Sequence, residues 1–138
     1  TYRVFEGYQS FSALITSFDE DGALLWSNDF EMRDVLSPQL RDNVTIRPDS
    51  TGIVAAMLQD GILSSKIIGQ NGNQLGQTEQ TKIENLFTND RLQEENFSNI
   101  SWWYDQYYIA TGYQRIANNR LRTNNPRSVF YIQKLVFE

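Results

Sequence analysis

The sequence predicts a β-rich domain of the α+β class, built as a small antiparallel barrel or a strongly bent sheet with one short helix. Aromatic and β-branched residues, which favour strands, are concentrated in several separate runs. Turns containing glycine separate some of these runs, as in hairpins. The longest runs carry apolar residues on both faces, so we expect both sides of those strands to be covered. A length of 138 residues with 40% apolar content suits a single domain over residues 1–138.

The first hairpin is expected from residues 11–18 and 23–32, which flank the acidic turn 19–22. Four apolar residues share one face of its second strand, with only Asn28 interrupting them: Leu24, Trp26, Phe30 and Met32. The acidic turn is too short for a calcium-binding loop and lacks its alternating ligands. We therefore interpret it as a plain turn.

A second hairpin is expected from residues 53–58 and 62–68 around Asp60 and Gly61. The alanine, methionine and leucine of the first segment also favour a helix, and we prefer the strand interpretation. A short strand over residues 44–47 should stop at the following proline.

The remaining segments predict one loop, one helix and two long strands. The glycines of residues 69–76 indicate a loop. Residues 78–87 begin with a threonine that can cap a helix and place apolar residues at helical spacing, whereas residues 89–99 are polar and expected to be irregular. Residues 102–116 and 129–137 are each expected to form one long strand. An exposed loop over 117–128 should connect these two strands.

Composition narrows the chemistry that this chain performs. The sequence has no His and no Cys, which excludes imidazole bases, thiolate nucleophiles and Cys/His zinc sites. It has no Gly-x-Ser-x-Gly element and no phosphate-binding glycine loop. A carboxylate pair of the glycosidase kind remains an alternative, although none of the seventeen acidic residues lies in a recognisable motif. We therefore expect no enzyme activity, no cofactor and no metal site.

Charge is unevenly distributed along the chain. The net charge is −5, yet residues 106–138 hold five basic residues and one acidic residue. This basic end either folds back onto the acidic body, is solvated, or forms a docking patch for an acidic partner or anionic headgroups. Nucleic acid is disfavoured by the acidic balance of the whole chain. The candidate partner-binding residues are Arg115, Arg120, Arg122 and Arg127.

Aromatic side chains are densest in the segment WWYDQYY, residues 102–108. Such a cluster suits a pocket for an apolar or sterol-like ligand, with tyrosine hydroxyls orienting it. It equally suits the core of a small barrel, which needs large side chains to fill it. The candidate ligand-binding residues are Trp26, Phe30, Trp102, Trp103, Tyr104, Tyr107, Tyr108 and Tyr113.

The same segment resembles the ToxS-like periplasmic accessory proteins, which act beside membrane-bound winged-helix activators. The resemblance rests on a Trp, a short polar gap, the strand YYIATGYQRI and the earlier hairpins, and it covers about a third of the chain. It implies a lipocalin-like barrel that senses a bile-salt-like ligand or stabilises its partner. The sequence departs from the family in having only a loop before its last strand, and it lacks the Gly-x-Trp signature of lipocalins.

We therefore expect an extracytoplasmic, non-catalytic regulatory or sensor domain in the bacterial periplasm, with a membrane anchor in the full-length protein. It would bind a membrane-anchored regulatory protein and a small apolar ligand, and would act by stabilising one partner conformation. One alternative is a free-standing carrier with a closed pocket. Another is a structural subunit of a surface appendage or secretion system that forms homo-oligomers. A partner-dependent domain should instead expose unpaired strand edges or an apolar patch.

Overall fold

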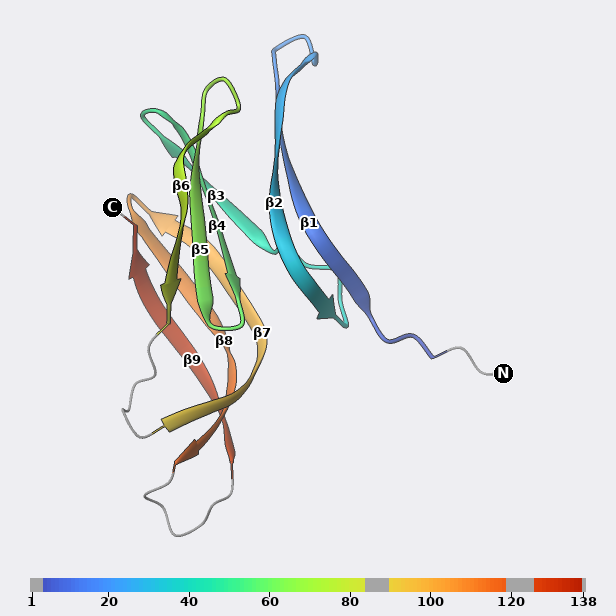
Figure 1. Ribbon diagram of the computed structural model, residues 1–138, viewed down its shortest axis with the longest axis vertical. Coiled ribbons are helices and arrows are strands. Elements are labelled where there is room, and N and C mark those ends of the chain that lie inside the picture. Colours follow the sequence, from blue (N-terminus) through green and yellow to red (C-terminus); the bar gives the residue numbers. More distant parts are fainter. Residues whose placement is uncertain (1–3, 84–89, 119–125, 138) are drawn as a thin grey trace.

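The computed structural model describes residues 4–83, 90–118 and 126–137, which form three antiparallel sheets (Figure 1). The sheets follow one another along the chain, and every paired strand is a neighbour in sequence, as in a meander. The first sheet holds two strands, the second four and the third three. The strands are β1 (Tyr8–Phe18), β2 (Leu24–Ser37), β3 (Val44–Asp49), β4 (Gly52–Gln59), β5 (Ile62–Gly69), β6 (Gln74–Lys82), β7 (Asp90–Tyr104), β8 (Tyr107–Asn118) and β9 (Arg127–Val136).

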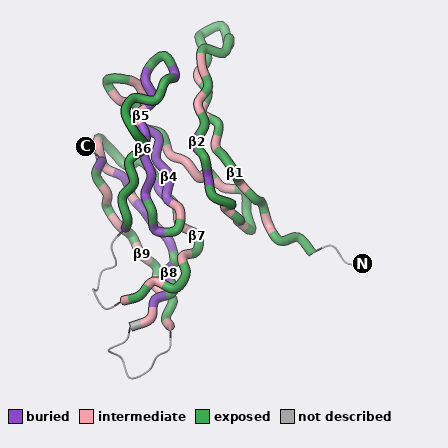
Figure 2. Tube along the Cα trace, viewed as in Figure 1, coloured by how far each residue is buried: buried purple, intermediate pink, exposed green. Residues whose placement is uncertain are grey.

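The second sheet, β3–β6, lies at the centre of the molecule, and its strands β4 and β5 are buried along most of their length (Figure 2). Ala55 and Ala56 point to opposite faces of β4, and both are fully buried. A strand that is buried on both faces carries a continuous apolar run instead of an alternating one. The sequence IVAAML of β4 is such a run, which is why it lies between two neighbouring sheets.

One face of the central sheet is covered by the β1–β2 hairpin. Phe30 and Met32 of β2 pack against Ala55, Met57 and Ile68 of the central sheet. Partly buried side chains from both sheets extend this first core cluster: Ala13, Ile15, Trp26, Val35, Val44 and Ile53. The predicted shared face of β2 is confirmed for Trp26, Phe30 and Met32. Leu24 lies beyond a register shift in the β1–β2 pairing and is 58% exposed, so the buried part of this face ends at Trp26.

The opposite face of the central sheet is covered by the β7–β9 sheet. Ala56, Leu58 and Leu63 of the central sheet pack against β7–β9 residues. The partners in this second core cluster are Ile100, Tyr108, Ala110 and Phe137, and Ile83, which follows β6, joins the same cluster. The central sheet therefore has a separate core on each side.

Both predicted hairpins are confirmed, and their turns have clear physical causes. In the β1–β2 turn the Asp19 carboxylate accepts hydrogen bonds from the backbone NH groups of Asp21 (3.0 Å) and Ala23 (2.7 Å). In the β4–β5 turn Asp60 and Gly61 both have positive φ, of 52° and 70°. This is the conformation that two-residue hairpin turns require, and aspartate and glycine adopt it readily.

Several sequence-based expectations were wrong. No described residue is helical, and residues 78–82 belong to strand β6; residues 84–87 of the expected helix lie outside the described part. The three sheets are open, so they form no closed barrel among the described residues. Residues 90–99, expected to be irregular, belong to β7. The expected long strand 102–116 is broken by a turn at 105–106. Its aromatic residues on both sides of the turn had concealed the break.

The expectation that both sides of the last strands are covered was also wrong. In β9, partly buried and exposed side chains alternate, with Phe130, Ile132 and Val136 exposed. Only the face toward the central sheet is covered. The other face is a solvent-exposed apolar surface.

Candidate functional site

The structure separates the eight aromatic residues that the sequence proposed as a ligand site. Trp26 and Phe30 lie between β2 and the central sheet. Tyr108 is fully buried between the central sheet and β7–β9, where its ring contacts Phe137 edge-on at 4.8 Å. The other five lie at the β7–β8 hairpin tip or on the outer side of β8. The chain therefore does not bring these side chains into one pocket.

Tyr108 belongs to the core and holds an arginine there. The Arg47 Nε group donates a hydrogen bond to the Tyr108 hydroxyl at 3.2 Å, and the guanidinium lies 3.7 Å from the Asp49 carboxylate. Burial raises the pKa of Tyr108, and the hydrogen bond and charge of Arg47 oppose that rise. Hydrogen bonds from Thr51 lower the pKa of Asp49. This cluster joins the ends of β3 and β8.

The tip of the β7–β8 hairpin is an exposed aromatic cluster. Trp102, Trp103 and Tyr104 are 41%, 54% and 45% exposed, so none of them is a core residue. The Trp102 indole NH donates to the backbone carbonyl of Asp105 at 2.9 Å, which fixes the turn. Successive rings of the cluster lie close together, with centroids 4.6 Å apart for Trp103 and Tyr104 and 5.0 Å apart for Tyr104 and Tyr107.

This cluster continues into a surface on the outer side of the third sheet. We name it the outer β8–β9 face, formed by Tyr107, Ile109, Tyr113, Arg115, Phe130, Ile132, Lys134 and Val136. Strand pairing places these residues opposite one another: Tyr107 with Val136, Ile109 with Lys134, and Tyr113 with Phe130. The rings of Tyr113 and Phe130 lie 5.2 Å apart. Contiguous exposed apolar surface of this kind marks an interaction site.

Two cations lie on this apolar surface. The Lys134 ammonium stands 3.6 Å from the centroid of the Tyr107 ring and 5.9 Å from that of Tyr104, in cation–π contact. Arg115 is exposed on β8, and the strand register places it opposite Glu94 of β7. Of the other proposed partner-binding arginines, Arg127 lies 3.6 Å from the Asp90 carboxylate. Arg120 and Arg122 lie outside the described residues.

Sequence reasoning missed the outer β8–β9 face because it assigned both sides of the last strands to a core. The signal was present in Lys134, which stands between Ile132 and Val136 on one side of β9. A lysine in the middle of an apolar stripe is rarely fully buried, so it indicates that the stripe meets solvent.

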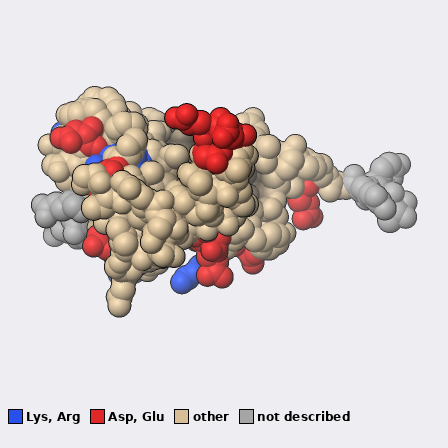
Figure 3. All heavy atoms as spheres, turned by 90° about the horizontal axis from the view of Figure 1, so that it is seen from above, with Lys and Arg blue, Asp and Glu red and all other residues tan. Residues whose placement is uncertain are grey.

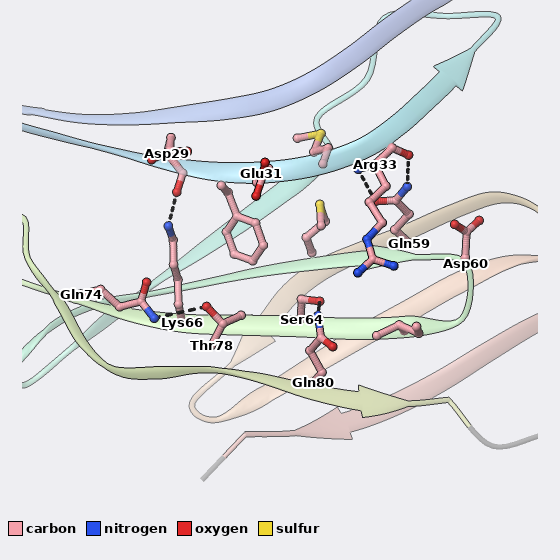
Figure 4. A pocket seen from close by; sticks show the side chains of 14 residues that line it. Asp29, Glu31, Arg33, Gln59, Asp60, Ser64, Lys66, Gln74, Thr78 and Gln80 are labelled. Carbon is pink, nitrogen blue, oxygen red and sulfur yellow. Dashed lines mark hydrogen bonds between the residues drawn. The ribbon is translucent and has the colours of Figure 1, made fainter.

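A polar cleft of about 590 Å³ lies between β2 and β6 over the central sheet (Figure 4). Lys66 rises from β5, and its ammonium donates to the Asn28 side-chain oxygen at 2.6 Å and to the backbone carbonyl of Asp29. Burial lowers the pKa of Lys66, and the Asp29 charge opposes this effect. Because Lys66 bonds to β2, its ammonium serves to hold the first sheet on the second.

A larger open groove, of about 1210 Å³, lies where the three sheets meet. The first strand of each sheet lines it: β1 with residues 12–16, β3 with residues 44–46 and β7 with residues 98–101. Most of the lining side chains on β1 and β7 are serine, threonine or asparagine. The first strands of the three sheets therefore border one common groove.

Among the described side chains, no group of three or more acidic residues is arranged to hold a metal ion. Within residues 4–83, 90–118 and 126–137, no helix has the length and hydropathy needed to span a bilayer. No family model, curated protein or solved structure matches this chain.

Proposed function

We propose that this protein is a non-catalytic binding domain whose working surface is the outer β8–β9 face. One observation supports the proposal most: the face exposes Tyr113, Phe130, Ile132 and Val136 to solvent, with exposed fractions between 47% and 66%. Aromatic residues and arginine are the types enriched in protein interfaces, and aromatic anchors supply most of the binding energy there. The face is the open surface of a sheet, whereas small-molecule sites are concave, so it suits a protein better than a small molecule.

The chemistry of the face defines the partner it fits. Its centre is apolar and aromatic, and Lys134 and Arg115 add positive charge. A complementary surface presents apolar side chains together with carboxylates, because opposite potentials steer association and suppress wrong partners. We infer a protein partner with an apolar, acidic face.

A regulatory or sensor role outside the cytoplasm remains part of this proposal. It draws on the resemblance to ToxS-like accessory proteins and on the composition of the chain. A protein that stabilises one conformation of a partner needs a rigid binding face, and a face built on paired strands meets that need. The carrier alternative is less well supported, because the groove of about 1210 Å³ is open and polar side chains make up more than half of its lining.

Site-specific photocrosslinking tests the proposal. A photoreactive phenylalanine analogue replaces Ile132 on the outer β8–β9 face, and a matched control replaces Glu79, an exposed residue of β6. We expect a discrete crosslinked product from position 132 in the cells that express the protein, and none from position 79. The product should disappear when Phe130→Lys is added, because a second lysine interrupts the apolar surface. Equal products from both positions, or none from position 132, would contradict the proposal.

A further inference from the structure

The protein itself carries a surface with the chemistry that the outer β8–β9 face requires. We name it the outer β1–β2 face, formed by Leu14, Phe18, Leu25, Asp29 and Glu31. Strand pairing places Leu14 opposite Asp29, on the side of the hairpin away from Phe30 and Met32. Leu14, Phe18 and Leu25 are 70%, 57% and 60% exposed. This face is therefore apolar and solvent-accessible.

The charges of the two outer faces are complementary. Asp29 and Glu31 are exposed on β2 at positions that alternate with Phe30 and Met32, so they add acidic charge to this face. Both also border the polar cleft, and the side chain of Arg33 turns down toward that cleft (Figure 4). The outer β8–β9 face carries Lys134 and Arg115, and its third strand adds Glu94. Viewed from above, the visible charged surface is mostly acidic with few cations (Figure 3).

The internal architecture shows how a further sheet would fit. Both faces of the central sheet are already covered by neighbouring meander sheets, through two separate apolar clusters. The first strands β1, β3 and β7 line one common groove. Meander sheets that stack face to face with their first strands together form the arrangement that β-propellers repeat around an axis. Each end of such a stack is a face shaped to receive another sheet.

We propose that the outer β8–β9 face of one copy packs on the outer β1–β2 face of a second copy, which continues the stack of sheets head to tail. The inference rests on the proposed function and names its partner as a second copy of this chain. Such a contact joins two different surfaces, so it is heterologous. It produces a ring if the rotation between copies closes and a filament if it does not.

Charge reversal on either face tests this arrangement. The purified chain should sediment as an oligomer whose average mass rises with concentration. Lys134→Glu places an acid opposite Asp29 and Glu31, and Glu31→Lys places a base opposite Lys134. We expect each variant alone to associate about tenfold or more weakly than wild type, because like charges then face each other. An equimolar mixture should recover the wild-type affinity, since each variant supplies an intact face to the other.

Matched controls lie on β6, away from both outer faces. Lys82→Glu and Glu79→Lys change the net charge by the same amounts and should sediment like wild type. Circular dichroism and thermal melting show whether each variant keeps the fold, because Lys134→Glu also removes a cation–π contact.

Three outcomes would overturn the inference. The wild-type chain could remain monomeric up to about 1 mM, which would mean a dissociation constant too high for specific assembly. The β6 variants could weaken assembly as much as the face variants do. Glu31→Lys could assemble like wild type while Lys134→Glu does not, which indicates a symmetric contact between two β8–β9 faces. A monomeric chain that still crosslinks from position 132 to a different protein would refute self-assembly and leave the proposed function standing.

Discussion

At the scale of single residues, Gly72 controls how closely the β5–β6 turn approaches β2. Its φ is +81°, and a Cβ atom at this position would lie 2.5 Å from the Cβ of Trp26. The Gly72 carbonyl also accepts a hydrogen bond from the Asn28 side chain at 2.9 Å. Any side chain at position 72 would therefore push the first sheet away from the second.

We predict that Gly72→Ala destabilises the protein through this contact. Gly76→Ala is the matched control, because Gly76 has a similar φ of +75° but no atom within 4 Å of the added Cβ. In both variants the alanine is strained, because an L residue rarely adopts a positive φ. Only Gly72→Ala also overpacks the contact with Trp26, which costs roughly 1–3 kcal/mol. The free energy of unfolding, measured in urea, should fall more for Gly72→Ala by that amount. Equal losses of unfolding free energy in the two variants would contradict this prediction. They would show that the β5–β6 turn moves away from Trp26 without a further cost.

The sequence predicted the burial of individual side chains only where apolar and polar residues alternate along a strand. Trp26, Phe30 and Met32 were correctly placed on one face because period-two alternation reveals a shared side. Leu24 fits the same pattern but lies nearer the turn, beyond the contact between Trp26 and Gly72. Sequence alone did not show where the covering sheet ends.

At the scale of elements, turns with a clear chemical signature were predictable and the others were not. Asp60-Gly61 carries two residues that tolerate positive φ, and the hairpin around it was predicted. In the β7–β8 turn Asp105 alone carries the positive φ, of 50°, and aromatic residues flank it on both sides. Residues 78–82 had a helical pattern of residue types, yet pairing with β5 makes them a strand. Tertiary pairing overrides weak local preference.

Strands β7 and β9 are joined across β8 by a buried carboxyl group. Glu95 accepts a hydrogen bond from the Tyr131 hydroxyl at 2.5 Å, and Gly112 of β8 provides the space for the tyrosine ring. The second carboxyl oxygen of Glu95 is buried without a hydrogen-bond partner. Burial raises the pKa of Glu95, the Tyr131 hydrogen bond lowers it, and the nearby Asp60 charge raises it further. The net direction is upward from the ordinary value.

We predict that Glu95→Gln makes the protein more stable than wild type at neutral pH. A folded-state pKa above the unfolded value means that the unfolded state loses its proton first as pH rises. Below about pH 4.5, the pKa of Glu95 in the unfolded chain, the wild-type protein therefore has its full free energy of unfolding. Stability is lost as the pH rises through the higher pKa that Glu95 has in the folded protein. The glutamine keeps an acceptor for Tyr131 and never ionises.

Urea denaturation at several pH values between 4 and 7 checks this prediction. The advantage of Glu95→Gln over wild type should be small at pH 4 and should grow as pH increases. Glu94→Gln is the matched control, because Glu94 is exposed on the same strand. A wild-type protein that gains stability relative to Glu95→Gln with rising pH would contradict the assigned cause.

At the scale of the whole molecule, the three-layer arrangement was beyond prediction from the sequence. The apolar residues on both sides of the last strands predict that both sides are covered, as they would be in a barrel or a strongly bent sheet. The sheets instead stack in chain order, so only the central one is covered twice. Which sheet lies in the middle depends on contacts between distant segments, and local patterns carry little information about such contacts. The candidate surface on β8 and β9 was missed for the same reason.

This layering predicts a gradient of local stability, which amide hydrogen exchange measures. Residues 54–58 of β4 are buried between two cores and paired on both sides, so their amides should exchange only through global unfolding.

The β1–β2 hairpin pairs with no third strand among the described residues. Its links to the central sheet are one apolar cluster and a few side-chain bonds, such as that from Lys66 to Asn28. The amides of β1 that bond to β2 should therefore exchange faster, through opening of the hairpin alone. The measurement is made on dilute protein, because a second copy on the outer faces would slow the same amides. Equal exchange rates in β1 and β4 would mean that the three sheets unfold as one cooperative unit.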